Sequence, residues 1–499
     1  MKNIHSKKGK VTAALTAALI TGSIASAMAG QPPKKLPAPE KPAANPLSFA
    51  DGILTFDFQE RVRFESRENN FDFTAKASPA PGGPTHGTDD SWALQRLRLG
   101  LTVKPTSWFK VYVQGQDSRE LFSDRQALDN RNTTVTAEGN DAFDLRQAYV
   151  ELADYKKCPW GLKLGRQVLS YGDERLVGGF EWNNIARTFD AAKLTYKGKG
   201  WAVDVFAATP VVPVAGEFNQ SDFLNGTESA RGEIFSGIYL TLDPIPYGTL
   251  DLYAFQLNSN SGGMTKAPLG VSTVGTLPGA TFKAGSDFTT FGTRIKGDPK
   301  KLNGWEYSGE FAYQTGRVQG LDLTAYAVSV GGGYNFKLPM SPRLYAEYNF
   351  ATGDKDSTDG SLQTFQNLFP TNHKFYGMMD VFSWQNMHNI LLSGRINVTK
   401  TVTAQLDYNA FWMAQNGDKH YRANGYASFG GVGGQDPGAG GYEGSELDAV
   451  VTWNAKKNLQ IQGGVAYYVP GQKFKNQILP GSVGHADARF AYLQATVNF

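Results

Sequence analysis

The chain has 499 residues, a formal net charge of +3 at pH 7 and one cysteine, Cys158. The near balance of charge excludes binding to nucleic acid through bulk charge, and a single cysteine excludes an internal disulfide scaffold. Mean hydropathy is −0.36, and beyond the N-terminus no apolar run is long enough for a transmembrane helix. Two classes of protein stay open: a soluble secreted protein, and an outer-membrane β-barrel, which is not apolar overall.

The N-terminus has the pattern of a secretory signal peptide. Four lysines among the first ten residues precede a short apolar run, residues 11–24, and small residues end it at Ala29. The run is too short to cross a bilayer, so residues 1–29 are predicted to be a cleaved signal peptide. Residues 30–50, rich in Pro, Lys and Ala, are predicted to be a flexible periplasmic leader, and residues 51–499 a single domain.

Strand periodicity begins near Ile53 and continues almost to the end of the chain. In the first segment Leu54, Phe56, Phe58, Val62 and Phe64 oppose Asp57, Gln59, Arg61 and Arg63. About eighteen such segments occur, each near the roughly 9–11 residues that span a bilayer at a tilt. Tight turns such as residues 104–107 alternate with long connections such as residues 71–91. The pattern predicts an all-β fold, a transmembrane antiparallel β-barrel with short periplasmic turns and long extracellular loops.

The last segment ends in an aromatic residue. Leu493, Ala495, Val497 and Phe499 share one of its faces. Such a final strand resembles the recognition signal that the barrel assembly machinery reads in outer-membrane proteins. Because an open strand edge is untenable in lipid, we expect the last strand to pair with the first. The expected surroundings are outer-membrane lipid, after cleavage of the signal peptide.

Basic residues collect on the polar strand faces that would line the lumen. They are Arg61, Arg63, Arg96, Arg98, Lys193, Arg294, Arg343 and Arg395. A basic arc in a low-dielectric wall attracts and guides anions, and the arginine fork can hold a carboxylate by two hydrogen bonds. Acidic residues on the same face of later strands, such as Glu347 and Asp448, leave a second interpretation open, in which the charges only stitch the inner wall together.

Strand phase is irregular at two arginines. The apolar face changes parity near Arg146, which indicates a β-bulge or a strand end. Continuing the register of Leu162 and Leu164 would point Arg166 at lipid, at a cost of about 2–4 kcal/mol at the bilayer midplane. We therefore expect the membrane-spanning part to end before Arg166, or the strand to contain a bulge.

The densest motif is residues 164–194, where three arginines alternate with acidic residues, Gly pairs and two Asn. A strand-like apolar run lies on each side of it. We predict a long connection between two strands that folds over or into the pore. The residues expected at the constriction are Asp173, Arg175, Trp182 and Asp190, with His373 from a second loop.

Signals for enzymes and metals are weak. The histidines are scattered without metal-ligand spacing, and no Gly-x-Ser-x-Gly lies between a strand and a helix. A barrel-embedded hydrolase of lipid or polysaccharide, and a plugged adhesin or binding barrel, stay open as alternatives to a porin. Asp354, Asp356 and Asp359 have a spacing reminiscent of a calcium loop, without the flanking helices and final Glu of an EF-hand. No other cofactor is expected.

Two blocks of sequence resemble the alginate-export-type outer-membrane porins. The first block falls within residues 164–191 (LGRQ, YGDERL, WN and RTFDA), and the second within residues 352–380 (TGD and TFQNLFPTNHKFYG). The resemblance implies a monomeric barrel of this size, whose basic lining passes an anionic polyuronate. It also implies that residues 165–190 and 362–380 restrict the outer side. The arginines to which it assigns the pore lining are Arg61, Arg96, Arg146, Arg166 and Arg187. The expected cargo is an anionic saccharide or a small organic anion.

Overall fold

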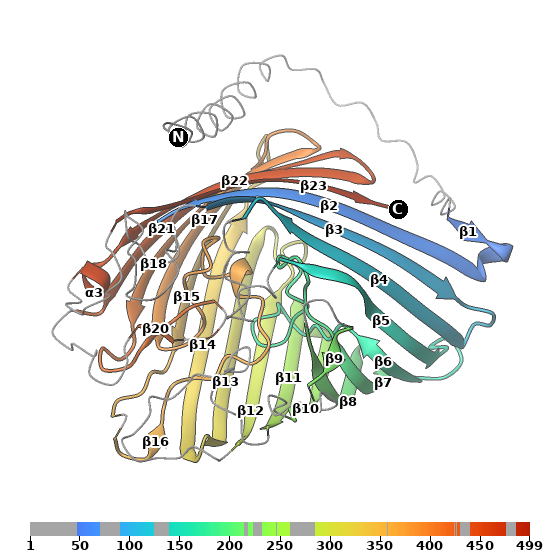
Figure 1. Cartoon of the computed structure of the whole chain (residues 1–499), viewed down its shortest axis with the longest axis horizontal. Coiled ribbons are helices and arrows are strands. Elements are labelled where there is room, and N and C mark those ends of the chain that lie inside the picture. The colour runs from blue at the N-terminus through green and yellow to red at the C-terminus, as the bar shows by residue number, and fades with distance from the viewer. Residues whose placement is uncertain are drawn as a thin grey trace, which may run out of the picture. The chain divides into compact units, whose positions relative to one another are not determined.

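Figure 1 shows the chain as a computed structural model. The structure describes residues 47–69, 90–123, 139–213, 218–222, 232–245, 247–259, 285–356, 358–423, 425, 427–429, 440–475 and 486–499. The predicted signal peptide, residues 1–29, and residues 30–46 of the predicted leader lie outside this part of the chain. The end of the leader belongs to the sheet, because β1 (Ser48–Phe49) pairs with the first long strand, β2 (Leu54–Glu68).

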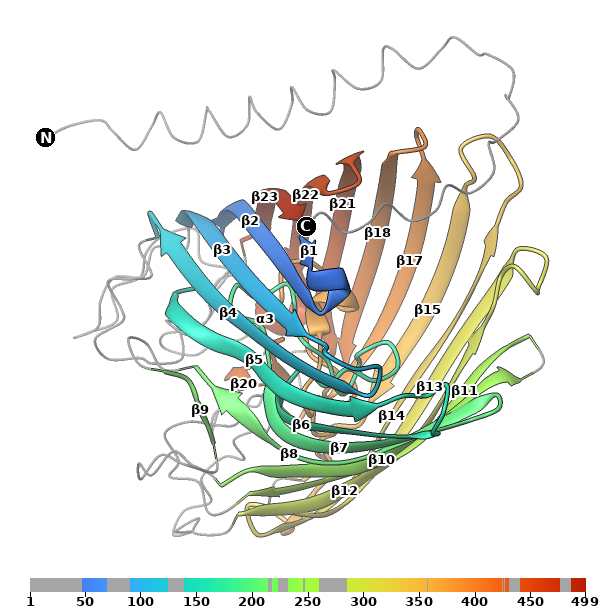
Figure 2. The same ribbon diagram turned by 90° about the vertical axis from the view of Figure 1, so that its right-hand side faces the viewer.

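Eighteen long strands of the described residues form one closed antiparallel barrel. They are β2 (Leu54–Glu68), β3 (Asp90–Val103), β4 (Phe109–Leu121), β5 (Asp141–Ala153), β6 (Trp160–Gln167), β7 (Phe189–Gly198), β8 (Trp201–Val212), β10 (Ile234–Ile245), β11 (Gly248–Ser259), β12 (Ser286–Gly297), β13 (Trp305–Val318), β14 (Leu321–Asn335), β15 (Arg343–Ala351), β17 (Met387–Asn397), β18 (Val402–Met413), β21 (Tyr442–Lys456), β22 (Leu459–Pro470) and β23 (Ala488–Asn498). The last strand, β23, pairs with β2 and closes the barrel. In Figure 2 the strands run from blue β2 through green and yellow and return to red β23. The predicted fold is confirmed.

The other elements are short. They are η1 (Ala50–Gly52), β9 (Gln220–Ser221), β16 (Ser361–Leu362), η3 (Asn372–Lys374), β19 (His420–Tyr421), β20 (Ala427–Phe429) and α3 (Gln472–Lys475). Within the ranges that the structure describes, no helix is both long and apolar enough to cross a membrane.

The two ends of the barrel differ in their connections. Residues 199–200 make the turn between β7 and β8, whereas residues 168–188 join β6 to β7 and residues 352–386 join β15 to β17 at the opposite end. The hairpin between β13 and β14 is an exception, because only two residues join these strands at the long-loop end. Exposed tryptophans mark the short-turn end: Trp108, Trp160, Trp201, Trp305 and Trp453. Short turns face the periplasm in outer-membrane barrels, which assigns this end to the periplasm.

Side chains alternate along the strands as the sequence predicts. Arg61 and Arg63 are 4% and 2% exposed, whereas Phe64 next to them is 55% exposed. Successive side chains in a strand point to opposite faces, so the arginines face the lumen and the phenylalanine faces lipid.

Two long connections fold into the lumen and pair with each other there (Figure 1). Residues 168–188 form the first inserted loop, and residues 352–386 form the second. Val177 and Phe369 make a parallel bridge, with a hydrogen bond from the Gly178 N–H to the Phe369 carbonyl at 2.8 Å. The loops share an apolar core with the wall, in which Phe365 and Trp384 are fully buried. The first connection was predicted to fold over or into the pore, and it folds into it.

Candidate functional site

Four arginines gather on one side of the lumen and are called the basic cluster below: Arg61, Arg96, Arg98 and Arg146. Arg61 on β2 lies directly opposite Arg96 on β3, and Arg98 occupies the next inward position along β3. All four side chains are buried within the barrel. Strand alternation alone therefore brings three like charges together, those of Arg61, Arg96 and Arg98, an arrangement that needs acceptors around it.

Glutamine side chains supply neutral acceptors for this cluster. Arg96 donates to Gln59 Oε1 at 2.8 Å, Arg98 to Gln116 Oε1 at 2.6 Å, and Arg146 to Gln114 Oε1 at 2.9 Å. These hydrogen bonds orient the guanidinium groups without cancelling their charge. The wall therefore keeps an excess of positive charge.

Arg146 enters the cluster through an irregularity of β5. Gln114 of β4 pairs with Gln147 of β5, and the next pair along is Gly115 with Leu145. The register between the two strands therefore shifts by one residue at Arg146. The extra residue in such a bulge changes the direction of its side chain, and Arg146 faces the lumen. The irregularity predicted near Arg146 is confirmed.

The first inserted loop places one carboxylate on the basic cluster. Glu181 Oε2 lies 2.8 Å from Arg98 Nη1 and 3.3 Å from Arg96 Nη2, and Arg146 pairs with the other carboxylate oxygen. Partial desolvation inside the barrel raises the pKa of the Glu181 carboxyl, but Arg146, Arg98 and Arg96 outweigh it and hold that pKa at about 2. The Glu181 side chain is still 51% exposed, so the group that the arginines bind also faces open space.

Backbone oxygens of the same loop take further donors. Arg61 Nη1 donates to the Glu181 carbonyl at 2.7 Å, and Arg96 Nη1 to the Asn183 carbonyl at 3.2 Å. The neighbouring Trp182 ring stacks on the Arg63 guanidinium at 3.7 Å and on the His373 ring at 3.9 Å. Trp182 thus joins the basic wall to the second inserted loop.

The opposite side of the lumen is acidic. Glu310 on β13 and Glu347 on β15, called the acidic wall below, face Arg175 of the first inserted loop. Arg175 Nη2 lies 2.6 Å from Glu347 Oε1, and its Nε lies 4.0 Å from Glu310 Oε2. Burial lowers the pKa of Arg175, but Glu347 and Tyr376 reverse this effect and raise the pKa above its ordinary value. Arg175 is therefore a buried, permanently charged anchor.

A third contact fixes the N-terminal part of the same loop. Asp173 pairs with Arg294 at 2.8 Å and with Lys296 at 2.5 Å, both on β12. Arg294 also donates to Asp251 on β11 at 2.6 Å. Burial raises the pKa of Asp173, but Arg294 and Lys296 outweigh it and lower that pKa to about 2. The loop is thus held across the lumen by charges of opposite sign on its two sides.

Comparisons with known proteins show the family and the fold of the chain. The profile of the alginate export family matches residues 53–483. The chain belongs to the alginate export family. No curated protein sequence matches the chain.

Solved structures from Pseudomonas aeruginosa share the fold at low identity. OprD is 12% identical with a TM-score of 0.54, covering 91% of this chain and 95% of its own. OccK9 (OpdG) is 13% identical with a TM-score of 0.55, covering 89% of this chain and 98% of its own. OccK11 (OpdR) is 11% identical with a TM-score of 0.54, covering 89% and 96%. The alginate export chain therefore has the fold of an outer-membrane porin.

Arg166 corrects the prediction drawn from the family resemblance. β6 continues through Gln167 and pairs with β7 without a register shift, so Arg166 shares the outward face with Leu164. Arg166 does not line the lumen. Its charge is balanced by Asp190 on β7, with hydrogen bonds of 2.9 and 3.1 Å. The predicted bulge does not occur, whereas the end of the membrane-spanning part before Arg166 stays a prediction. Asp190 likewise lies on the outer wall and not at a constriction.

Arg187 also has a different place from the one predicted. It is buried between the two inserted loops, where its Nη1 donates to the carbonyls of Gly178 and Pro370, each at 3.0 Å. Burial lowers its pKa to about 10. Arg187 holds the loops together instead of lining an open path.

The remaining predicted wall residues form a ladder towards the short-turn end. Lys193 pairs with Asp204 at 2.9 Å, and Arg343 pairs with Glu306 at 2.6 Å. Arg395 lies opposite Arg343 in the register and is exposed. The contacts of Lys193, Arg343 and Arg294 fit the interpretation in which ion pairs only hold the inner wall together. The basic cluster differs, because it has more cations than carboxylates.

The calcium prediction concerns residues 354–359. Asp356 Oδ1 accepts from Thr358, and Asp359 Oδ1 accepts from Ser361, so both carboxylates bond to their own turn. Asp354 is buried, and its backbone N–H donates to Asp418 Oδ2 at 2.8 Å. Across the described ranges, no group of three His, Cys, Asp or Glu side chains is placed to hold a metal ion. Calcium binding at this loop stays a prediction.

The sequence did not single out the residues that complete the basic cluster. Glu181 stands in the dense motif directly before Trp182, but nothing local shows that its carboxylate reaches β3 and β5. The glutamines on β2 and β4 follow the inward period, and that periodicity was the available signal.

Proposed function

We propose that the protein is an outer-membrane porin that passes anionic solutes by diffusion along the basic cluster. The observation that carries this proposal is the imbalance of charge: the basic cluster has four guanidinium groups, three of which share the half-exposed carboxylate of Glu181, while Arg61 donates to the backbone carbonyl of the same residue. A local excess of positive charge in a low-dielectric wall raises the concentration of anions near it.

The contacts of Glu181 also support carboxylates as the anionic group. Arg98 and Arg146, on different strands, each donate to one of its two oxygens, and such charge-assisted hydrogen bonds between guanidinium and carboxylate are among the strong ones. An acidic polysaccharide such as alginate carries one carboxylate on each sugar, and a small organic anion carries the same group. The proposed cargo is therefore an anionic saccharide or a small organic anion, taken up or released by a monomer in outer-membrane lipid.

The test is the reversal potential of the purified protein in a planar bilayer across a potassium chloride gradient. We expect anion selectivity, and its loss in the double variant Arg96→Gln, Arg98→Gln. The matched control is Arg317→Gln, Arg489→Gln, because both residues are exposed and pair with acids at the long-loop end. Cation selectivity of the unchanged protein, or equal selectivity of the two double variants, would refute the proposal.

A second candidate function is a binding barrel whose lumen stays closed. The shared apolar core of the inserted loops favours it, because Phe365, Tyr376 and Trp384 are fully buried inside the barrel. Conductance separates the two functions. A channel that conducts only after Arg175 is replaced would favour the closed barrel, whereas conductance of the unchanged protein favours the porin.

A further inference from the structure

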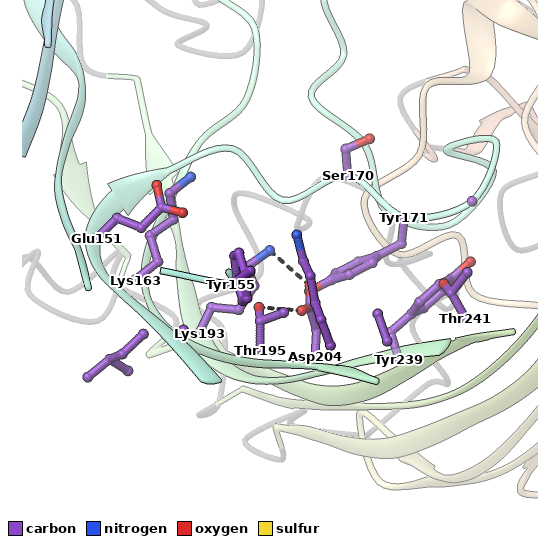
Figure 3. Close-up of a pocket in the computed structure, with 15 residues that line it drawn as sticks. Glu151, Tyr155, Lys163, Ser170, Tyr171, Lys193, Thr195, Asp204, Tyr239 and Thr241 are labelled. Atoms are coloured by element: carbon purple, nitrogen blue, oxygen red, sulfur yellow. Dashed lines mark hydrogen bonds and ion pairs between the residues drawn. The ribbon is translucent and has the colours of Figure 1, made fainter. Parts of the chain in front are cut away.

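A separate cavity of about 390 Å³ lies in the inner wall at the short-turn end (Figure 3). Residues of β5, β6, β7, β8 and β10 form its wall, and Ser170, Tyr171 and Gly172 of the first inserted loop contribute the rest of the lining. Tyr155 in the turn between β5 and β6, and Lys197 near the end of β7, also line it. The volume falls in the range of roughly 300–1,000 Å³ that small-molecule sites occupy.

Lysines dominate the charge of this cavity. Lys163, Lys193 and Lys197 line it together with two acids, Glu151 and Asp204. Both acids already pair with a lysine other than Lys163. Asp204 accepts from Lys193 at 2.9 Å, and Glu151 pairs with Lys110.

Among the described residues neither Lys163 nor Lys197 has a carboxylate partner; Lys197 lies 3.9 Å from the centre of the Tyr155 ring and is exposed, whereas Lys163 is half-buried. The Lys163 amino group lies 3.9 Å from the centre of the Tyr149 ring, and the described residues offer it no carboxylate oxygen within ion-pair distance. An ammonium held over an aromatic face keeps its charge available to a third group. Figure 3 shows Lys163 beside Glu151, with Lys193 and Asp204 joined next to it.

Aromatic faces and hydroxyl groups complete the lining. Tyr171 stacks on Tyr239 with ring centres 4.6 Å apart, and its hydroxyl donates to Asp204 at 3.2 Å. Thr195 and Thr241 add hydroxyl groups. A flat apolar surface, several hydroxyls and a spare ammonium match a sugar ring that bears a carboxylate, because such a ring has an apolar face, a polar edge and one charge.

We propose that this cavity binds one uronate residue of an anionic saccharide, at a site separate from the basic cluster and nearer the periplasm. The proposal rests on the proposed function, since it names a second contact for the same class of cargo. Lys163 would take the carboxylate, and the tyrosines would take the sugar face. A chain of uronates could then contact this cavity and the basic cluster in succession.

Isothermal titration calorimetry of the full-length protein in detergent tests the site, with digalacturonate as the probe and maltose as the neutral sugar. We expect digalacturonate to bind and maltose not to bind. Replacing Lys163→Gln should raise the Kd about tenfold, which corresponds to about 1.4 kcal/mol and the loss of one charge-assisted hydrogen bond. Lys163→Arg should keep most of the affinity and shows that loss of folding is not the cause.

The matched control is Lys457→Gln, which removes the same charge from an exposed position in the short turn between β21 and β22. It should leave the Kd unchanged. Equal affinity of the unchanged protein and Lys163→Gln, or binding of benzoate in place of digalacturonate, would overturn the proposal.

Failure of the proposed porin function can be distinguished from failure of the cavity site. No digalacturonate binding by a protein that is anion selective in the bilayer removes the cavity site and leaves the porin. Binding that depends on Lys163 in a protein without anion selectivity removes the porin and keeps the site.

Discussion

The basic cluster and the acidic wall hold the same inserted loop in opposite ways. At the acidic wall one loop cation, Arg175, meets two wall carboxylates and is buried with them. At the basic cluster one loop anion, Glu181, meets several wall cations and stays half exposed. In the first arrangement the wall carboxylates neutralise the charge of Arg175, and the ion pairs anchor the loop. The second leaves more cations than carboxylates on that side of the lumen, which is the side of the proposed anion path.

Breaking the acidic side should give the largest effect. Replacing Arg175→Met leaves Glu310 and Glu347 buried without their cation, and losing one partner of a buried pair costs about 3–5 kcal/mol. We expect the first inserted loop to detach from the wall. Limited proteolysis should then cleave within residues 168–188, and single-channel conductance should rise.

The control for this experiment is Arg317→Gln, an exposed pair whose loss should change neither readout. Protection from protease equal to that of the unchanged protein would show that Arg175 is not the anchor.

Changing the basic side should alter selectivity instead of loop attachment. Replacing Glu181→Gln removes the one carboxylate of the basic cluster, while the backbone carbonyls of the loop still accept from Arg61 and Arg96. One unit charge at about 4 Å in a hydrated site is worth about 1 kcal/mol, or roughly a fivefold change in local anion concentration. Reversal potentials should therefore move towards stronger anion selectivity. A shift towards cations would show that Glu181 is not the charge that limits anions.

Acid should weaken the ion pairs that the two loop carboxylates, Glu181 and Asp173, make with the barrel wall. The pKa of Glu181 and that of Asp173 are each about 2 in the folded protein, below the ordinary values of 4.5 and 3.8. A lowered pKa stabilises the folded state above the ordinary value, and this contribution is lost as the pH falls towards 2. Protease sensitivity of residues 168–188 should rise as the pH is lowered from 4.5 towards 2, with an acid-active protease. In Glu181→Gln only the part due to Asp173 should remain, so an identical pH profile in the variant would contradict this assignment.

The sequence predicts the wall better than it predicts the loops. Period-2 alternation fixes which face Arg61 and Arg96 occupy, because a strand has only two faces. It also placed Arg166 on the lipid side, but the cost of a lone charge there argued against that placement. The partner that removes the cost, Asp190, is 24 residues away and lies opposite only through strand pairing.

Loop contacts follow from tertiary structure that no local pattern records. Glu181 reaches the basic cluster because the first inserted loop pairs with the second one at Val177 and Phe369. Arg187 was assigned to the pore lining for its charge, yet the same loop pairing buries it. A residue type at a loop position thus predicts chemistry, but its direction depends on the partner loop.

The smallest effect is expected for the Arg166–Asp190 pair on the outer wall, which tests whether only lumenal charges affect selectivity. Replacing Arg166→Met and Asp190→Leu together removes both charges from a lipid-facing position, where well-packed apolar residues substitute for an ion pair at little cost or with a gain. We expect the free energy of unfolding to change by less than about 1 kcal/mol and the reversal potential to stay unchanged. Asp190→Asn alone leaves Arg166 without its partner and should cost up to about 1 kcal/mol, because Arg166 stands one residue before the end of β6 and an unpaired charge costs less near the interface than at the midplane. Urea unfolding in lipid vesicles measures both values. A changed reversal potential in the double variant would return Arg166 to the anion path, because only a charge near the lumen acts on the permeating ions.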